Sequence, residues 1–147
     1  MKTSYLAILA LLFILTNCKD EDPDPCTGYF YDKPLENVKH CLQGKWQMHY
    51  YIFGFTFERI PLEDYYFTIT KSDSVIFEKA QVVIRDKIKW SPITDMRGNK
   101  TYTLEFDYFG DGIYRYQFAV EGIHAGDTLV LFENAADGNG YFFTRLD

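Results

Sequence analysis

Apolar and polar side chains alternate residue by residue along most of the chain after residue 44, and this alternation constrains the fold more than any other feature. In the clearest run, Val82, Ile84 and Ile88 occupy one phase, while Arg85 and Lys87 occupy the other. Successive side chains of a strand point to opposite faces, so strict alternation predicts a sheet with one dry face and one wet face. Such one-sided strands are typical of antiparallel sheets. No stretch keeps a sustained helical period, which excludes a parallel α/β fold.

Eight runs of this kind can be delimited, at 45–52, 65–70, 74–78, 82–90, 101–108, 114–120, 129–132 and 141–146. The links between them carry turn residues, as at 71–73 and 137–140, and links this short join neighbouring strands as hairpins. Eight one-sided strands in a meander either close into a barrel or form two packed sheets. We expect an all-β, eight-stranded antiparallel up-and-down barrel over residues 41–147, because hairpin-length links leave little room for Greek-key crossovers.

Composition supports strands and excludes one class of partner. Aromatic residues make up 18% of the chain, and their rings pack well on a pleated, half-buried surface. The net charge of −6 repels phosphate backbones, so we expect no nucleic-acid partner. The length of 147 residues suits one domain, which we expect to be a monomer.

The N-terminus has the zones of an export signal. Lys2 supplies a positive charge, and residues 5–15 form an apolar run that is too short to span ~30 Å of hydrocarbon as a helix. The sequence Leu15-Thr16-Asn17-Cys18 resembles a lipobox, the cleavage site of bacterial lipoproteins. This resemblance implies that residues 1–17 are removed as a signal peptide and that Cys18 receives the lipid that anchors the chain to a membrane. The alternative is an ordinary secretory signal followed by an incidental cysteine.

Residues 18–40 are expected to form a tether and a short helical turn. The stretch 19–25 is acidic, contains two prolines and lacks apolar residues, which predicts an extended, solvated segment. A lysine followed by acidic residues also resembles the surface-export signal of some Gram-negative lipoproteins. We therefore expect the chain on the outer membrane and exposed at the cell surface, with the periplasmic face as the alternative. Residues 34–40 suit a helical turn, with Asp32 as its N-cap and Pro34 in its first turn.

Cys26 and Cys41 are the two cysteines that follow the anchor. Exported chains reside where disulfides form, and two cysteines allow one pairing. Closing a loop of about 16 residues would stabilise the fold by roughly 3 kcal/mol. Two buried free thiols or a metal pair are the alternatives, although a closed zinc site needs four ligands and only His40 lies nearby.

A family resemblance begins at Gly44-Lys45-Trp46, a Gly-x-Trp at the start of the first strand that resembles the lipocalin signature. The C-terminal stretch from residue 127 resembles the closing hairpin of bacterial lipocalin-like lipoproteins. The resemblance implies a lipocalin-like barrel in which a late arginine, here Arg145, stacks on the signature tryptophan, Trp46. The residues themselves support a structural role for the pair, since a guanidinium over an indole contributes ~0.5–2 kcal/mol.

No motif supports catalysis. The histidines His40, His49 and His124 are far apart in the sequence, and neither a metal-ligand spacing nor a nucleophile elbow is present. We expect no enzyme activity, no catalytic residue, no cofactor and no metal site.

The inward phase of the expected barrel carries large rings with polar tips. We expect it to bind a small apolar or amphipathic ligand in a barrel-mouth pocket. The candidate residues are Tyr50, Tyr65, Asp86, Trp90, Tyr102 and Tyr116. The alternative is a core filled by its own rings, with Asp86 at a bulge or bonded to a tyrosine hydroxyl.

A second hypothesis places binding on the outer face or the loops. Tyr51, Phe53, Phe55 and Phe57 cluster around Gly54, and exposed aromatic clusters mark interfaces with proteins or glycans.

Overall fold

The structure is a computed structural model that describes residues 24–107, 116–125, 127–134 and 138–146. The expected signal (1–17), the lipidation site Cys18 and most of the tether lie outside these residues. The elements are β1 (Gly28–Tyr29), α2 (Leu35–Leu42), β2 (Gly44–Ile52), β3 (Arg59–Ile69), β4 (Ser74–Lys79), β5 (Val82–Lys87), β6 (Lys89–Thr94), β7 (Lys100–Phe106), β8 (Tyr116–His124), β9 (Thr128–Glu133) and β10 (Gly140–Arg145). Within the described part of the chain, no helix is long and apolar enough to cross a bilayer.

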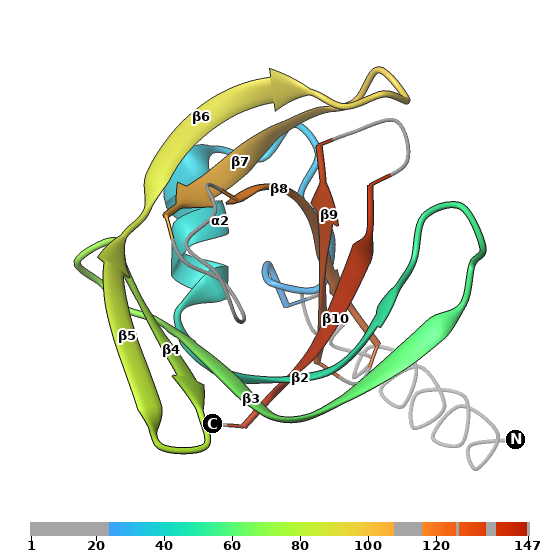
Figure 1. The fold of residues 1–147 in the computed structure, drawn as a ribbon. Coiled ribbons are helices and arrows are strands. Elements are labelled where there is room, and N and C mark those ends of the chain that lie inside the picture. The colour runs from blue at the N-terminus through green and yellow to red at the C-terminus, as the bar shows by residue number, and fades with distance from the viewer. Residues whose placement is uncertain (1–23, 108–115, 126, 135–137, 147) are drawn as a thin grey trace, which may run out of the picture.

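All strands belong to one antiparallel sheet with the order β5-β4-β3-β2-β10-β9-β8-β7-β6, and β1 pairs with the end of β8. Figure 1 shows these strands following one another around a ring, with α2 lying inside its outline. The prediction of an all-β, antiparallel fold is confirmed. The predicted closed barrel of eight strands is not confirmed, because the sheet has ten strands and, among the described residues, no pairing joins β5 to β6.

The sheet is open where the sequence pattern predicts one strand over 82–90. The strand is interrupted there at Ile88, which is buried. The N–H of Ile88 donates to the carbonyl of Asp73 (2.8 Å) and takes no part in the hydrogen bonds between paired strands. β5 ends before Ile88 and β6 begins after it, so the two strands form the two edges of the sheet. Pro92 in β6 agrees with this position, because proline has no N–H to donate and is confined to edge strands.

The interior is filled by rings from opposite sides of the sheet. Phe67 of β3 contacts Phe143 of β10 and Phe106 of β7, with ring centroids 5.6 Å and 5.7 Å apart, and Phe106 contacts Phe118 of β8 at 5.7 Å. All four side chains are almost fully buried. These rings form the centre of one core cluster to which α2 contributes Val38, Cys41 and Leu42.

A bulge in β2 reverses the phase of its last residues. The register with β3 shifts between Met48 and Tyr50, so Trp46, Met48 and then Tyr51 pack against the core. The prediction that Tyr50 points inward is therefore wrong, since one extra residue moves every later side chain to the other face.

α2 lies against the start of β2 and the end of β10. The indole N–H of Trp46 donates to the carbonyl of Leu42 (2.9 Å), and the guanidinium of Arg145 lies 4.5 Å from the centre of the Trp46 ring and donates to the carbonyl of Cys41. A disulfide joins Cys26 to Cys41.

The predicted N-cap of this helix is wrong. Pro34 occupies the N-cap position without a side-chain cap, and Asp32, two residues earlier, has a φ of +57°.

Candidate functional site

The structure does not gather the six predicted ligand-binding residues into one pocket. Tyr50 lies on the face opposite to the core, stacked on Phe142 (centroids 4.6 Å apart), with the Arg59 guanidinium 3.8 Å from its ring centre. Tyr65 and Tyr102 are partly buried against the core. Tyr116 begins β8, and its side chain lies outside the described part of the structure.

Asp86 bonds to backbone amides at the open edge of the sheet. Its Oδ1 accepts the N–H of Lys87 and its Oδ2 accepts the N–H of Asp107, both at 2.7 Å. The carboxylate thus links β5 to the residue that follows β7. These two hydrogen bonds give Asp86 a structural role. Its partners are backbone N–H groups and not the tyrosine hydroxyl considered from the sequence.

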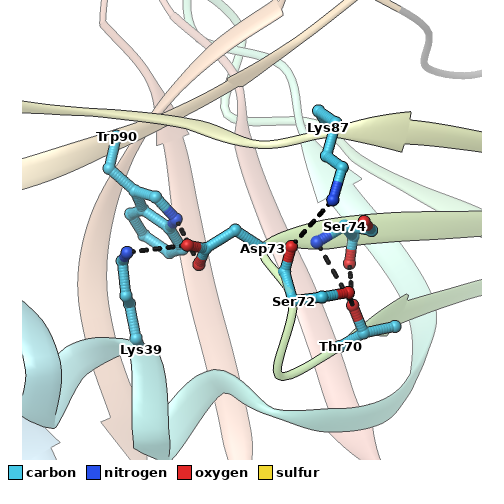
Figure 2. A network of polar contacts seen from close by, with 7 residues as sticks. All are labelled: Lys39, Thr70, Ser72, Asp73, Ser74, Lys87 and Trp90. Atoms are coloured by element: carbon cyan, nitrogen blue, oxygen red, sulfur yellow. Dashed lines mark hydrogen bonds and ion pairs between the residues drawn. The ribbon is translucent and has the colours of Figure 1, made fainter.

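Trp90 belongs to a polar network that fastens α2 to the turn between β3 and β4 (Figure 2). Asp73 accepts the indole N–H of Trp90 on Oδ1 (3.0 Å) and the ammonium of Lys39 on Oδ2 (2.8 Å). Lys87 donates to the carbonyl of Ser72 (3.0 Å) in the same turn. A hollow of about 290 Å³ adjoins this network, but the indole N–H is already bonded to the fold.

A second hollow has a composition better suited to a ligand. This outer pocket of about 320 Å³ is defined by Tyr31, Gly54, Phe57, Asp95, Met96, Arg97, Thr101, Ala119, Val120, Glu121, Phe132, Glu133, Asn134 and Gly138. Thr101, Ala119 and Phe132 belong to the phase of β7, β8 and β9 opposite to the core residues, so the pocket lies on the outer face of the sheet.

The turn between β6 and β7 forms one wall of the outer pocket. Asp95 Oδ1 accepts the backbone N–H groups of Arg97 (2.9 Å) and Asn99 (2.8 Å), and Gly98 adopts a φ of +86°. Partial burial raises the pKa of Asp95, but these bonds and one from the Asn99 side chain outweigh it and hold the pKa below its ordinary value. This turn, closed by these hydrogen bonds, contributes Met96 and Arg97 to the pocket lining.

Glu121 is the least well satisfied charge of the outer pocket. Its side chain is only 11% exposed, and it makes two long ion pairs, with Arg97 (3.5 Å) and with His124 (3.7 Å), but no hydrogen bond to a described residue. Burial raises the pKa of the Tyr31 phenol, and the carboxylates of Glu121 and Asp95 raise it further. The guanidinium of Arg97 acts in the opposite direction and lowers this pKa.

Glu133, the third acidic residue of the outer pocket, is the last residue of β9, and both of its carboxylate oxygens accept hydrogen bonds. It accepts the hydroxyl of Tyr141 at 2.6 Å and both the backbone and the side-chain N–H groups of Asn139 at 3.2 Å.

The turn between β2 and β3 also contributes to the outer pocket and carries exposed rings. Phe55 and Phe57 are 72% and 81% exposed, and Met96 of the turn between β6 and β7 is 71% exposed. Phe57 has a φ of +54°, a conformation that is rare for a bulky residue. We call Phe53, Phe55 and Phe57 the aromatic turn.

The sequence indicated the three exposed rings of the aromatic turn, but Tyr51, which was expected to be exposed with them, packs against the core. The sequence pattern gave no sign of the rest of the outer pocket. Thr101 and Ala119 occupy the positions of their strands that the alternation assigns to solvent, and the pattern contains nothing to indicate that they are buried there.

Within the described ranges, no three His, Cys, Asp or Glu side chains come together as metal ligands. Comparisons with protein-family models, with curated proteins and with solved structures find no match to this chain.

Proposed function

We propose that this chain is a membrane-anchored lipoprotein whose β-domain binds a small amphipathic ligand in the outer pocket. The observation that carries the proposal is the lining of this pocket, where the apolar side chains of Phe57, Met96 and Phe132 lie beside charged ones. Ligand pockets of about 300 Å³ or more with apolar walls and few polar groups are the usual form of small-molecule sites.

The anchor half of the proposal rests on the lipobox resemblance at Cys18. Five residues lie between Cys18 and Asp24, the first described residue, and a chain of this length reaches at most about 20 Å. The domain would thus stay close to the bilayer. Its place on the outer membrane, facing the cell exterior, rests on the resemblance of the acidic stretch after Cys18 to a surface-export signal. Labelled palmitate should be incorporated into the chain and lost in Cys18→Ser. Absence of label from the unmodified chain contradicts the anchor without touching the ligand site.

A lipocalin-like design for the domain is supported by the ring of strands and by Arg145 over Trp46. The proposed ligand position differs from the barrel-mouth site expected from the sequence. Phe67 and Phe106 meet inside the sheet, so the interior at that level is occupied by side chains.

Native mass spectrometry of the full chain purified from its own host tests the ligand site. We expect a co-purified small molecule that is lost in Phe57→Ala and retained in Phe55→Ala. The two substitutions remove the same exposed ring from the same turn, but Phe57 lines the outer pocket and Phe55 does not. A molecule that survives Phe57→Ala contradicts the proposed location.

A second candidate function is docking of a protein or a glycan through the aromatic turn. The high exposure of Phe55, away from the pocket, is the observation that favours it. In this case Phe55→Ala and Phe57→Ala would weaken partner capture to a similar extent.

A further inference from the structure

We infer that the ligand of the outer pocket carries a positive charge, as an ammonium or guanidinium group on an apolar body, and that Glu121 selects this charge. The inference rests on the proposed function and specifies the class of ligand.

The charge balance of the outer pocket is the first argument. Three carboxylates, those of Asp95, Glu121 and Glu133, line it against one guanidinium, that of Arg97, which leaves a formal charge of −2. Burial is the main cause of the raised pKa of the Tyr31 phenol, and the carboxylates of Glu121 and Asp95 add to it. A cation entering the pocket gains from the imbalance, whereas an anion is opposed by it.

The state of Glu121 is the second argument. Asp95 and Glu133 each accept several hydrogen bonds, but Glu121 has only ion pairs of 3.5 Å and 3.7 Å with described residues. No fully buried side-chain oxygen of a described residue lacks a hydrogen-bond partner, so the Glu121 oxygens keep some contact with water. A charged donor at hydrogen-bond distance would still replace a long ion pair by a shorter and stronger contact. The Arg97 side chain is 70% exposed, so it loses little when a ligand cation replaces it at Glu121.

The rings of the outer pocket are the third argument. Tyr31 and Phe57 both line it, and aromatic faces attract ammonium and guanidinium groups. The same rings and Phe132 can hold the apolar body of the ligand. The combination of a poorly satisfied carboxylate with aromatic walls distinguishes this pocket from the polar hollow beside Asp73.

Three indoles of matched size test the inference: tryptamine, which is cationic, tryptophol, which is neutral, and indole-3-acetate, which is anionic. Each is titrated calorimetrically into the full chain in lipid nanodiscs, with empty nanodiscs as the background. We expect tryptamine to bind roughly tenfold more tightly than tryptophol, as one charge-assisted hydrogen bond predicts, and indole-3-acetate to bind most weakly.

Glu121→Gln should remove the preference for tryptamine over tryptophol, because it keeps the shape of the side chain and removes its charge. Glu63→Gln, at an exposed position of β3 outside the pocket lining, is the matched control and should keep the preference. Thermal unfolding of both variants checks that they fold.

Equal affinity for the three probes, preference for the anion, or a preference that survives Glu121→Gln overturns the inference and leaves the proposed function standing. Absence of binding by all three also overturns it, and the co-purification experiment then decides the proposed function independently.

Discussion

The rings of Phe67 and Phe106 lie with their centroids 5.7 Å apart, although four strands separate β3 from β7 along the sheet. The contact therefore crosses the interior and does not run along one wall. Both side chains are almost completely buried, so the two walls support each other at this level. This packing is the reason to look for a ligand on the outer face.

Phe67→Ala should lower the free energy of unfolding by about 3–5 kcal/mol, because it leaves a cavity where opposite walls meet. Urea denaturation followed by tryptophan fluorescence measures the change. Phe55→Ala, which removes an equally large but exposed ring, should change stability by no more than about 0.5 kcal/mol. A similarly small effect at Phe67 would show that the interior is loosely packed.

Asp73→Asn should lower the free energy of unfolding by about 1 kcal/mol, because it removes the ion pair with Lys39 at a half-exposed site. Asp64→Asn is a matched control: Asp64 also has a positive φ, of +59° against +54° for Asp73, and asparagine tolerates both. The urea midpoint of each variant gives the comparison. Equal midpoints would mean that the Lys39–Asp73 ion pair adds nothing to stability.

Phe57→Gly should raise the free energy of unfolding by about 0.5–1 kcal/mol, because glycine adopts positive φ without steric cost. The same change should reduce retention of the co-purified molecule. Phe55 does not have a positive φ, so its replacement by glycine should not raise the free energy of unfolding. Thermal unfolding and native mass spectrometry measure the two effects, and a loss of stability at Phe57 would contradict the assigned strain.

The stabilising effect of Asp95 should disappear in acid. Its pKa is lower in the folded chain, so its contribution is fully present above the unfolded value of about 3.9 and is lost as the pH falls through the folded value. The melting temperature of Asp95→Asn should therefore be lower than that of the unmodified chain near neutral pH and should converge with it in acid. A difference that stays constant from about pH 6 to pH 2 would contradict this assignment.

Alternation of side chains sufficed to predict the fold class and most strands, but not the places where the pattern is broken. The bulge after Met48 moves Tyr50 out of the core phase, and apolar residues on both sides of it conceal the change. The break at Ile88 is equally hidden, because Val82, Ile84, Ile88 and Trp90 keep one phase through it. β1 has only two residues, too few for any period to be detected.

The candidate site was harder to predict than the fold, because it lies on the face that the pattern marks as wet. Thr101 and Ala119 line the pocket together with residues from other parts of the chain, including Tyr31 and Phe132. Glu121 acquires its setting from the register shift between Val120 and Gly122. Tertiary contacts create both features, and no local signal encodes them.

The Cys26–Cys41 bond also determines how a mechanical load would travel through the molecule. Tension applied upstream of residue 26 has a covalent route straight to Cys41 in the last turn of α2, three residues before β2 begins. The two-residue strand β1 lies within the bypassed loop and is thereby spared from peeling off the edge of β8. Without the bond, that short pairing would be the first to bear the force.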